Sequence, residues 1–214
     1  LDGFNFDYVR YDGNQYGYNP IAKERFRSEY GYYPPTSTSH PNWPVWAAWK
    51  RRQVTDLVRK CYVEATHINP RIKMTVDSIG WSGPDPSVNF EGTRAYSEVC
   101  QDHKGWMQEG IIDVNILMNY KREWCTASEP CWTYGGQTYC GGDQQGDHRL
   151  WSNWLKNMQA STGRHVIDGI GGYMNVMSGI LTQWQYSRAN GVGLGIFRYG
   201  FTIGMEDPAH PGKP

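Results

Sequence analysis

The sequence predicts an α/β protein built on a parallel β-sheet, and three observations support this class. Segments of strand character alternate with segments of helical character along the chain, an order that produces parallel strands joined by helices. Residues 111–120 form a near-continuous apolar run, as expected for a parallel strand that is buried on both faces. The segments after strands are long, whereas the turns after helices are short.

The first half of the chain contains two predicted strands and two predicted helices. Residues 1–11 alternate between apolar and polar side chains, which predicts a strand. Apolar residues recur at helical spacing over 46–68, and an Asn-Pro pair ends that helix. Residues 72–81 alternate and are rich in β-branched side chains, which predicts the second strand. A helix is predicted over 93–108, where one stripe is apolar and a glycine follows.

The second half repeats this pattern. The apolar run 111–120 is the third strand, and a helix rich in tryptophan follows over 147–160. Residues 166–174 form the fourth predicted strand, and residues 176–189 form the last helix. Residues 192–199 have strand character again. The sequence therefore predicts five strands joined by four helices.

Two closures of such a sheet are possible, an open doubly wound sheet and a (β/α) barrel. No glycine-rich phosphate-binding motif follows the first strand, and the long segments 12–45, 82–92 and 121–146 all follow strands. In a barrel, the loops after the strands build the working face. We therefore predict the (β/α)8 TIM-barrel type, with residues 1–205 as its C-terminal five βα units (strands four to eight) and residues 206–214 as a Pro-rich tail. Since a complete barrel has eight strands, we expect three further βα units upstream.

The composition excludes several classes of protein. The chain has 214 residues with 21 Lys plus Arg and 21 Asp plus Glu, so its formal net charge is zero. Binding to nucleic acid requires a basic excess, so no nucleic-acid partner is expected. No apolar run reaches about 18 residues, so no membrane span is expected. Aromatic residues make up 14% of the chain, which excludes disorder and suits the binding of sugar rings.

Asp7 is the leading candidate for a catalytic role. Alternation in the first strand places Tyr8 on the side that packs against helices, and it directs Asn5 and Asp7 into the barrel. Asp7 also lies near the carboxyl end of its strand, where the catalytic groups of barrels are found. An inward carboxylate is a costly packing residue unless it is paired. The alternative interpretation is an ion pair with Arg10 that holds the following loop.

A second carboxylate would complete the machinery for cleavage of a glycosidic bond. That reaction uses one carboxyl group to protonate the leaving oxygen and another as base or nucleophile. Glu123 is the first candidate, because it follows a strand whose end also carries Asn119 and Tyr120. A solvated surface position for Glu123 is equally compatible with the sequence. Asp77 is the rival candidate, because it lies within the second strand, where alternation leaves its direction undecided.

Aromatic residues recur at the predicted strand ends. Rings with polar rims at the mouth of a barrel form subsites for sugar rings, although each residue taken alone is more often a packing residue. We predict that substrate binding involves the aromatic residues at these ends together with nearby polar residues, namely Asn5, Arg10, Tyr11, Trp81, Asn119, Tyr120, Trp124, Tyr173 and Tyr199.

No metal site and no cofactor are predicted. The six histidines are scattered, without the close pairs typical of metal sites. No nucleophile-elbow motif is present. Cys125, Cys131 and Cys140 lie in one long loop. A disulfide between two of them would indicate an oxidising compartment, and the sequence leaves the pairing open.

Several motifs occur in order along the chain, at Asp2–Tyr11, Tyr16–Pro20, Trp49–Thr55 and Met118–Glu123. Together they resemble one known family over roughly residues 1–200. They are similar to the bacterial glycosyl-hydrolase-like family of envelope proteins, whose members include glycosidases that act on peptidoglycan strands stripped of their stem peptides. The first motif also resembles, more distantly, the nucleophile strand of α-amylase-type barrels.

The resemblance implies a TIM barrel that hydrolyses O-glycosidic bonds in a polysaccharide. It also implies export, and hence an extracellular, periplasmic or cell-envelope location. It marks Asp7 as the leading catalytic carboxylate, with Arg10, Tyr120 and Glu123 as members of the site. The alternative hypothesis is a non-catalytic carbohydrate-binding or surface protein derived from the same barrel, in which sugar binding would survive the loss of Asp7.

Overall fold

The protein is built around one parallel sheet. The computed structural model describes residues 1–85, 87, 89–128, 131–134, 137–140 and 142–198. Five strands pair in the order β1-β2-β3-β6-β7, and every pairing among them is parallel. The strands span Gly3–Phe6 (β1), Lys73–Ile79 (β2), Val114–Asn119 (β3), His165–Gly171 (β6) and Gly193–Phe197 (β7). Chain order equals sheet order, so the predicted series of C-terminal βα units of a barrel is confirmed.

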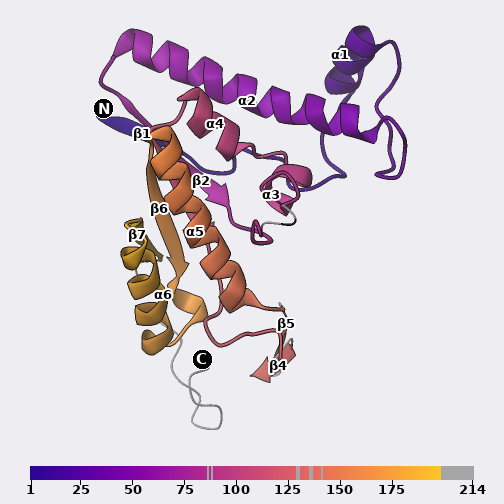
Figure 1. Cartoon of the computed structure of the whole chain (residues 1–214). Helices are drawn as coiled ribbons and strands as arrows, with labels where there is room; N and C mark the ends of the chain where they lie inside the picture. Colours follow the sequence, from indigo (N-terminus) through magenta and orange to yellow (C-terminus); the bar gives the residue numbers. More distant parts are fainter. Residues whose placement is uncertain (86, 88, 129–130, 135–136, 141, 199–214) are drawn as a thin grey trace.

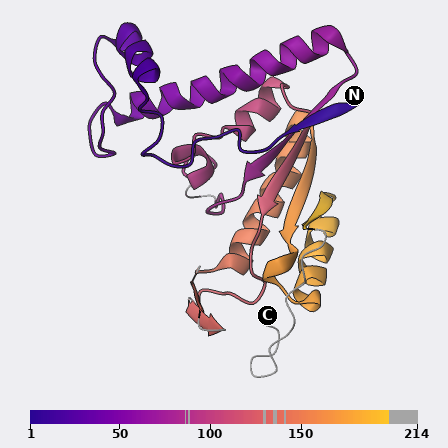
Figure 2. The same cartoon turned by 180° about the vertical axis from the view of Figure 1, so that it is seen from behind.

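The helices that separate the strands cover one face of the sheet. Figure 1 shows α5 and α6 in front of the strands, and Figure 2 shows the sheet from the opposite side. The long α2 crosses the end of the sheet at which the strands begin. The helices span Pro20–Tyr30 (α1), Trp43–Ile68 (α2), Arg94–Ser97 (α3), His103–Glu109 (α4), Gln144–Thr162 (α5) and Met177–Ala189 (α6), with a 3₁₀ turn at Gly172–Met174.

The main hydrophobic core lies between the sheet and these helices. Alternate residues of the central strands point toward the helices and are buried, for example Met74, Leu117 and Val166. They pack against residues of α2, α4 and α5, including Trp106 and Trp151. Because side chains alternate between the two faces of a strand, the intervening residues point to the opposite face, the interior side of a barrel. That face carries the candidate site.

The segment 12–45, which was expected to be a loop, contains the helix α1. The side chain of Asn19 caps its first turn by accepting from the backbone N–H of Ala22 at 2.9 Å, and Gly31 ends it in the left-handed conformation (φ 82°). Phe26 is the only fully buried residue of α1, which explains the weak apolar pattern in the sequence. Phe26 packs against Trp46 in a second, aromatic core that is separate from the first.

Two further expectations were wrong in detail. The helix predicted over 93–108 consists of two short helices, α3 and α4, because Cys100 adopts a left-handed conformation (φ 59°) that no helix can continue. The segment 121–146 contains an antiparallel hairpin of Cys131–Tyr134 (β4) and Gln137–Cys140 (β5).

The Pro-rich tail 206–214 lies outside the described residues. Within the described residues, the helices are too short or too polar to cross a membrane.

Candidate functional site

Asp7 and Asp77 lie beside each other at the carboxyl ends of β1 and β2. The register pairs Phe6, the last residue of β1, with Val76. Asp7 directly follows β1, and Asp77 follows Val76 two residues before the end of β2. Both follow Asn5 and Thr75 by two residues, so all four side chains belong to the face away from the helices. The structure thus resolves the direction of Asp77, which alternation alone left open.

Asp77 is half-buried and held by a short chain of hydrogen bonds. The amide Nδ2 of Asn5 donates to Oδ2 of Asp77 at 2.7 Å, and the hydroxyl of Thr75 donates to Oδ1 of Asn5 at 2.5 Å. Burial raises the pKa of Asp77, the bond from Asn5 opposes this rise, and the negative charge of Asp7 adds to it. Such a carboxyl group holds its proton to higher pH than an exposed aspartate does.

Asp7 is exposed to solvent, and its surroundings differ from those of Asp77. Its Oδ1 accepts from the backbone N–H of Tyr8 at 2.8 Å. Among the residues that the structure describes, Asp7 has no ion pair with Arg10, which was the structural alternative for this carboxylate. The guanidinium carbon of Arg10 instead lies 4.0 Å from the ring centre of Tyr8. Two neighbouring carboxyl groups in unlike environments suit unlike roles in acid–base chemistry.

Aromatic rings lie next to this pair of carboxyl groups. The ring of Tyr120 stacks on Phe197 with centroids 5.3 Å apart, and Tyr173 meets Tyr120 edge to face at 6.2 Å. Burial, together with the charges of Asp77 and Asp7 and the nearby Tyr173, raises the pKa of Tyr120 to about 12. Tyr120 therefore remains a neutral hydroxyl that can donate or accept a hydrogen bond. Phe197 was not predicted as a site residue.

Tyr8 is oriented differently from the prediction. Its backbone is left-handed (φ 57°), which is unfavourable for a residue other than glycine. This conformation reverses the alternation, so that Val9 is buried in the core and Tyr8 is 67% exposed beside Asp7. No local signal in the sequence indicates this reversal. An exposed ring held in a strained conformation next to a carboxylate is a candidate platform for a sugar ring.

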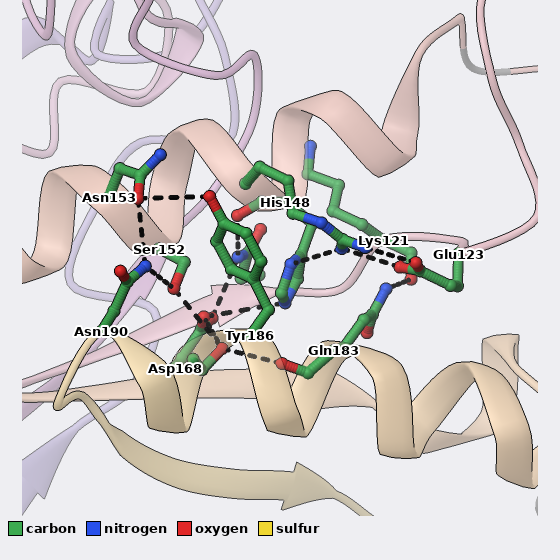
Figure 3. Close-up of polar contacts among 12 residues, drawn as sticks. Lys121, Glu123, His148, Ser152, Asn153, Asp168, Gln183, Tyr186 and Asn190 are labelled. Atoms are coloured by element: carbon green, nitrogen blue, oxygen red, sulfur yellow. Dashed lines mark hydrogen bonds and ion pairs between the residues drawn. The ribbon is translucent and has the colours of Figure 1, made fainter.

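Glu123 lies in a different polar cluster. Its carboxylate accepts from Nη1 of Arg149 at 2.8 Å, from Nη2 of Arg149 and from Nε2 of Gln145 at 2.9 Å. Its backbone N–H donates to Asn175 at 2.7 Å. Figure 3 shows Glu123 in a network with Lys121 and His148. These contacts hold the loop after β3, and the role of Glu123 as the second catalytic carboxylate stays a prediction.

Asn119 points to the helices and not to the site, contrary to the expectation. Its side chain is fully buried and donates to Asp168 at 2.9 Å and to the backbone carbonyl of His148 at 3.2 Å. Asp168 also accepts from the hydroxyl of Ser187 at 2.7 Å. Burial raises the pKa of Asp168 and lowers the pKa of His148 to about 3. Figure 3 shows this network between the sheet and the helices, where it stabilises packing and has no access to a substrate.

The remaining residues that were predicted to bind substrate lie in different surroundings. Tyr11 packs against the main core and lies over Lys50, so it is a packing residue. Trp81 is 38% exposed just after β2, and the guanidinium carbon of Arg94 lies 5.0 Å from its ring centre. The Nε1 of Trp124 donates to the carbonyl of Met174 at 3.3 Å. Tyr199 lies outside the described residues.

The predicted cysteine loop contains one disulfide-bonded cysteine and one free thiol. Cys131 is disulfide-bonded. Cys125 is a buried thiol whose Sγ donates to the carbonyl of Gly142 at 3.2 Å, so it is not part of that bridge. Within the described ranges, no three His, Cys, Asp or Glu side chains come together as metal ligands.

The fold and the site define a class of protein. Parallel βα units with two carboxyl groups and stacked rings at the carboxyl ends of the strands are the arrangement of a glycosidase-like barrel. The family model of glycosyl hydrolase-like 10 matches residues 1–133, and the chain belongs to this family. The match includes Asp7, Asp77 and Tyr120. No curated protein matches the chain significantly.

Proposed function

We propose that this protein hydrolyses O-glycosidic bonds in a polysaccharide and that Asp7 and Asp77 are the catalytic carboxyl groups. The observation that carries the proposal is their position on neighbouring strands, at the carboxyl ends, in environments that differ in burial. Asp77, with its raised pKa, is the proton donor to the leaving oxygen, and Asp7 acts on the sugar carbon. Family membership supports glycosidase chemistry.

The spacing of the two strands supports a retaining mechanism. The backbones of neighbouring strands lie about 4.8 Å apart, so side chains at matching positions on them can reach the separation of about 5–5.5 Å that retaining glycosidases use between their carboxyl groups. Inverting enzymes need a wider gap of about 6.5–9.5 Å for a water molecule. Asp7 is therefore the nucleophile in this proposal. Asp7 bonds to the anomeric carbon while Asp77 protonates the leaving oxygen, so the glycosidic bond breaks and a glycosyl ester of Asp7 forms. Asp77, now a carboxylate, takes a proton from the water that displaces Asp7 and releases the sugar.

The substrate and compartment are proposed from supporting observations. The disulfide of Cys131 supports an oxidising compartment, outside the cytoplasm or in the cell envelope. Peptidoglycan glycan strands are the first polysaccharide to test, given the resemblance of the motifs. Since the sheet has five strands among the described residues and a barrel has eight, we also propose that further βα units of the intact protein complete it.

The test compares three variants of the intact protein on a panel of polysaccharides, with release of reducing ends as the measurement. Asp7→Asn and Asp77→Asn should each lower turnover at least about 100-fold. Asp12→Asn, an exposed aspartate in the following loop, is the matched control and should be unchanged. On aryl glycosides, whose leaving groups need no proton, Asp77→Asn should keep the first step and its kcat/KM, but kcat should fall because the second step still lacks its base. Full activity of Asp7→Asn would refute the proposal.

The alternative of a non-catalytic sugar-binding protein has a separate outcome in the same experiment. In that case the wild-type protein would release no reducing ends, yet it would bind oligosaccharides. Binding would survive Asp7→Asn, because stacking of sugar rings on aromatic side chains does not need the carboxylate. Binding would weaken in Tyr8→Ala and Tyr120→Ala, because these variants lose the rings on which the sugar stacks. Titration calorimetry with oligosaccharides of the panel separates the two functions.

A further inference from the structure

A chain of two hydrogen bonds connects β1 to the side chain of Asp77. Thr75 and Asp77 lie on the same face of β2, and Asn5 lies opposite Thr75 on β1. The hydroxyl of Thr75 donates to Oδ1 of Asn5, and Nδ2 of Asn5 donates to Oδ2 of Asp77. With the carbonyl oxygen of the amide paired to this hydroxyl, the N–H end of Asn5 faces the carboxyl group, which can act only as an acceptor when it is ionised.

We propose that Asn5, oriented by Thr75, is a positioning residue that occupies Oδ2 of Asp77 and leaves Oδ1 as the oxygen that carries the proton. This inference rests on the proposed function, since it concerns how Asp77 acts as the acid. A carboxylic acid can accept through one oxygen and donate through the other. Asn5 assigns these two roles before a substrate binds, and this preorganises the direction of proton transfer.

The other groups around Asp77 do not replace Asn5. Among the residues that the structure describes, the titratable groups on this side include Asp7 at the end of β1, Tyr120 after β3 and Tyr173 after β6, and Ile116 is the neighbour of Asp77 on β3. Asp7 is negatively charged when ionised, and it opposes ionisation of Asp77. Asn5 is the hydrogen-bond donor described at the carboxyl group of Asp77. Its loss should therefore raise the pKa of Asp77 further.

The experiment measures the titration of the Asp77 carboxyl carbon by ¹³C NMR in the intact protein. Asn5→Ala should raise the pKa of Asp77 by about one unit, a tenfold change in proton affinity. Thr75→Val has nearly the same shape as threonine but lacks the hydroxyl, and it should cause a smaller rise. Thr75→Ser keeps the hydroxyl and should leave the pKa of Asp77 at the wild-type value.

The readout separates this inference from a packing role and from the proposed function. If Asn5 only held β1 against β2, Asn5→Ala would lower the unfolding temperature and leave the pKa of Asp77 unchanged, and this result would overturn the inference. The titration is measured whether or not the protein cleaves a glycoside. If turnover is present, the alkaline limb of its pH profile should move upward in Asn5→Ala; an unmoved limb would also overturn the inference.

Discussion

Replacing Glu123 by glutamine distinguishes a structural ion pair from a catalytic carboxylate. The side chain of Glu123 is 10% exposed and that of Arg149 is 22% exposed. Glutamine keeps one acceptor oxygen but loses the charge that holds both guanidinium nitrogens. Charge-assisted hydrogen bonds contribute about 1.5–3 kcal/mol each. With one such bond lost and a discount for partial exposure, we expect a loss of about 2 kcal/mol in unfolding free energy.

Urea denaturation measures this loss as a lower midpoint with an unchanged slope. For a chain of this size, about 2 kcal/mol corresponds to a fall in unfolding temperature of about 4–8 °C. Glu24→Gln, in an ion pair that is more than half exposed on both sides, is the control and should leave the urea midpoint almost unchanged. Turnover per folded molecule should be retained. Lost turnover at wild-type stability would refute the structural role and identify Glu123 as a catalytic group.

Three further substitutions test other parts of the structure. Gly171→Ala would place a Cβ 3.1 Å from the Cβ of Tyr120; we expect displacement of the Tyr120 ring, weaker oligosaccharide binding by calorimetry and a stability loss of about 1–2 kcal/mol. Asp168→Asn tests the buried network. Because burial raises the folded-state pKa of Asp168, its contribution to stability is present below about pH 4 and is lost as the pH rises through the raised value. Urea titrations should therefore show the stability of the variant rising relative to that of wild type as the pH increases from about 4 through the raised pKa, and a pH-independent difference would contradict this. Trp46→Ala removes a fully buried ring that contacts Phe26 at a centroid distance of 5.1 Å, and should cost about 3–5 kcal/mol and expose α1 to proteolysis. An α1 that stays resistant to protease would argue against the second core.

The strands were predictable because their physical signal is strong. A parallel strand covered by helices needs apolar residues toward the core, and the run at 111–120 is apolar at most of its positions. The helix α1 was missed because it buries only Phe26 and so has almost no apolar stripe. The break between α3 and α4 was missed because it depends on one left-handed residue, Cys100, which has no compositional signature.

The candidate site was only partly predictable for a similar reason. Asp7 could be placed at a strand end from alternation and the family motif, but the direction of Asp77 depends on its register with β1, a long-range property. Tyr8 faces solvent because of one backbone angle, which alternation cannot include. Glu123 has its partner Arg149 on α5, 26 residues away in the chain. A sequence shows which residues carry charge, but tertiary contacts decide which of these charges are already paired.

The helix α2 belongs to both hydrophobic cores. Its first turns bury Trp46 and Trp49 in the aromatic core, and its later turns bury Val54 and Val58 against the sheet. A continuous helix of 26 residues extends about 39 Å and cannot lose one half of its packing without weakening the other. Heating should therefore unfold the aromatic core around α1 and the parallel sheet in one cooperative transition. A substitution that destabilises the aromatic core should then also destabilise the carboxyl ends of the strands, where the candidate site lies.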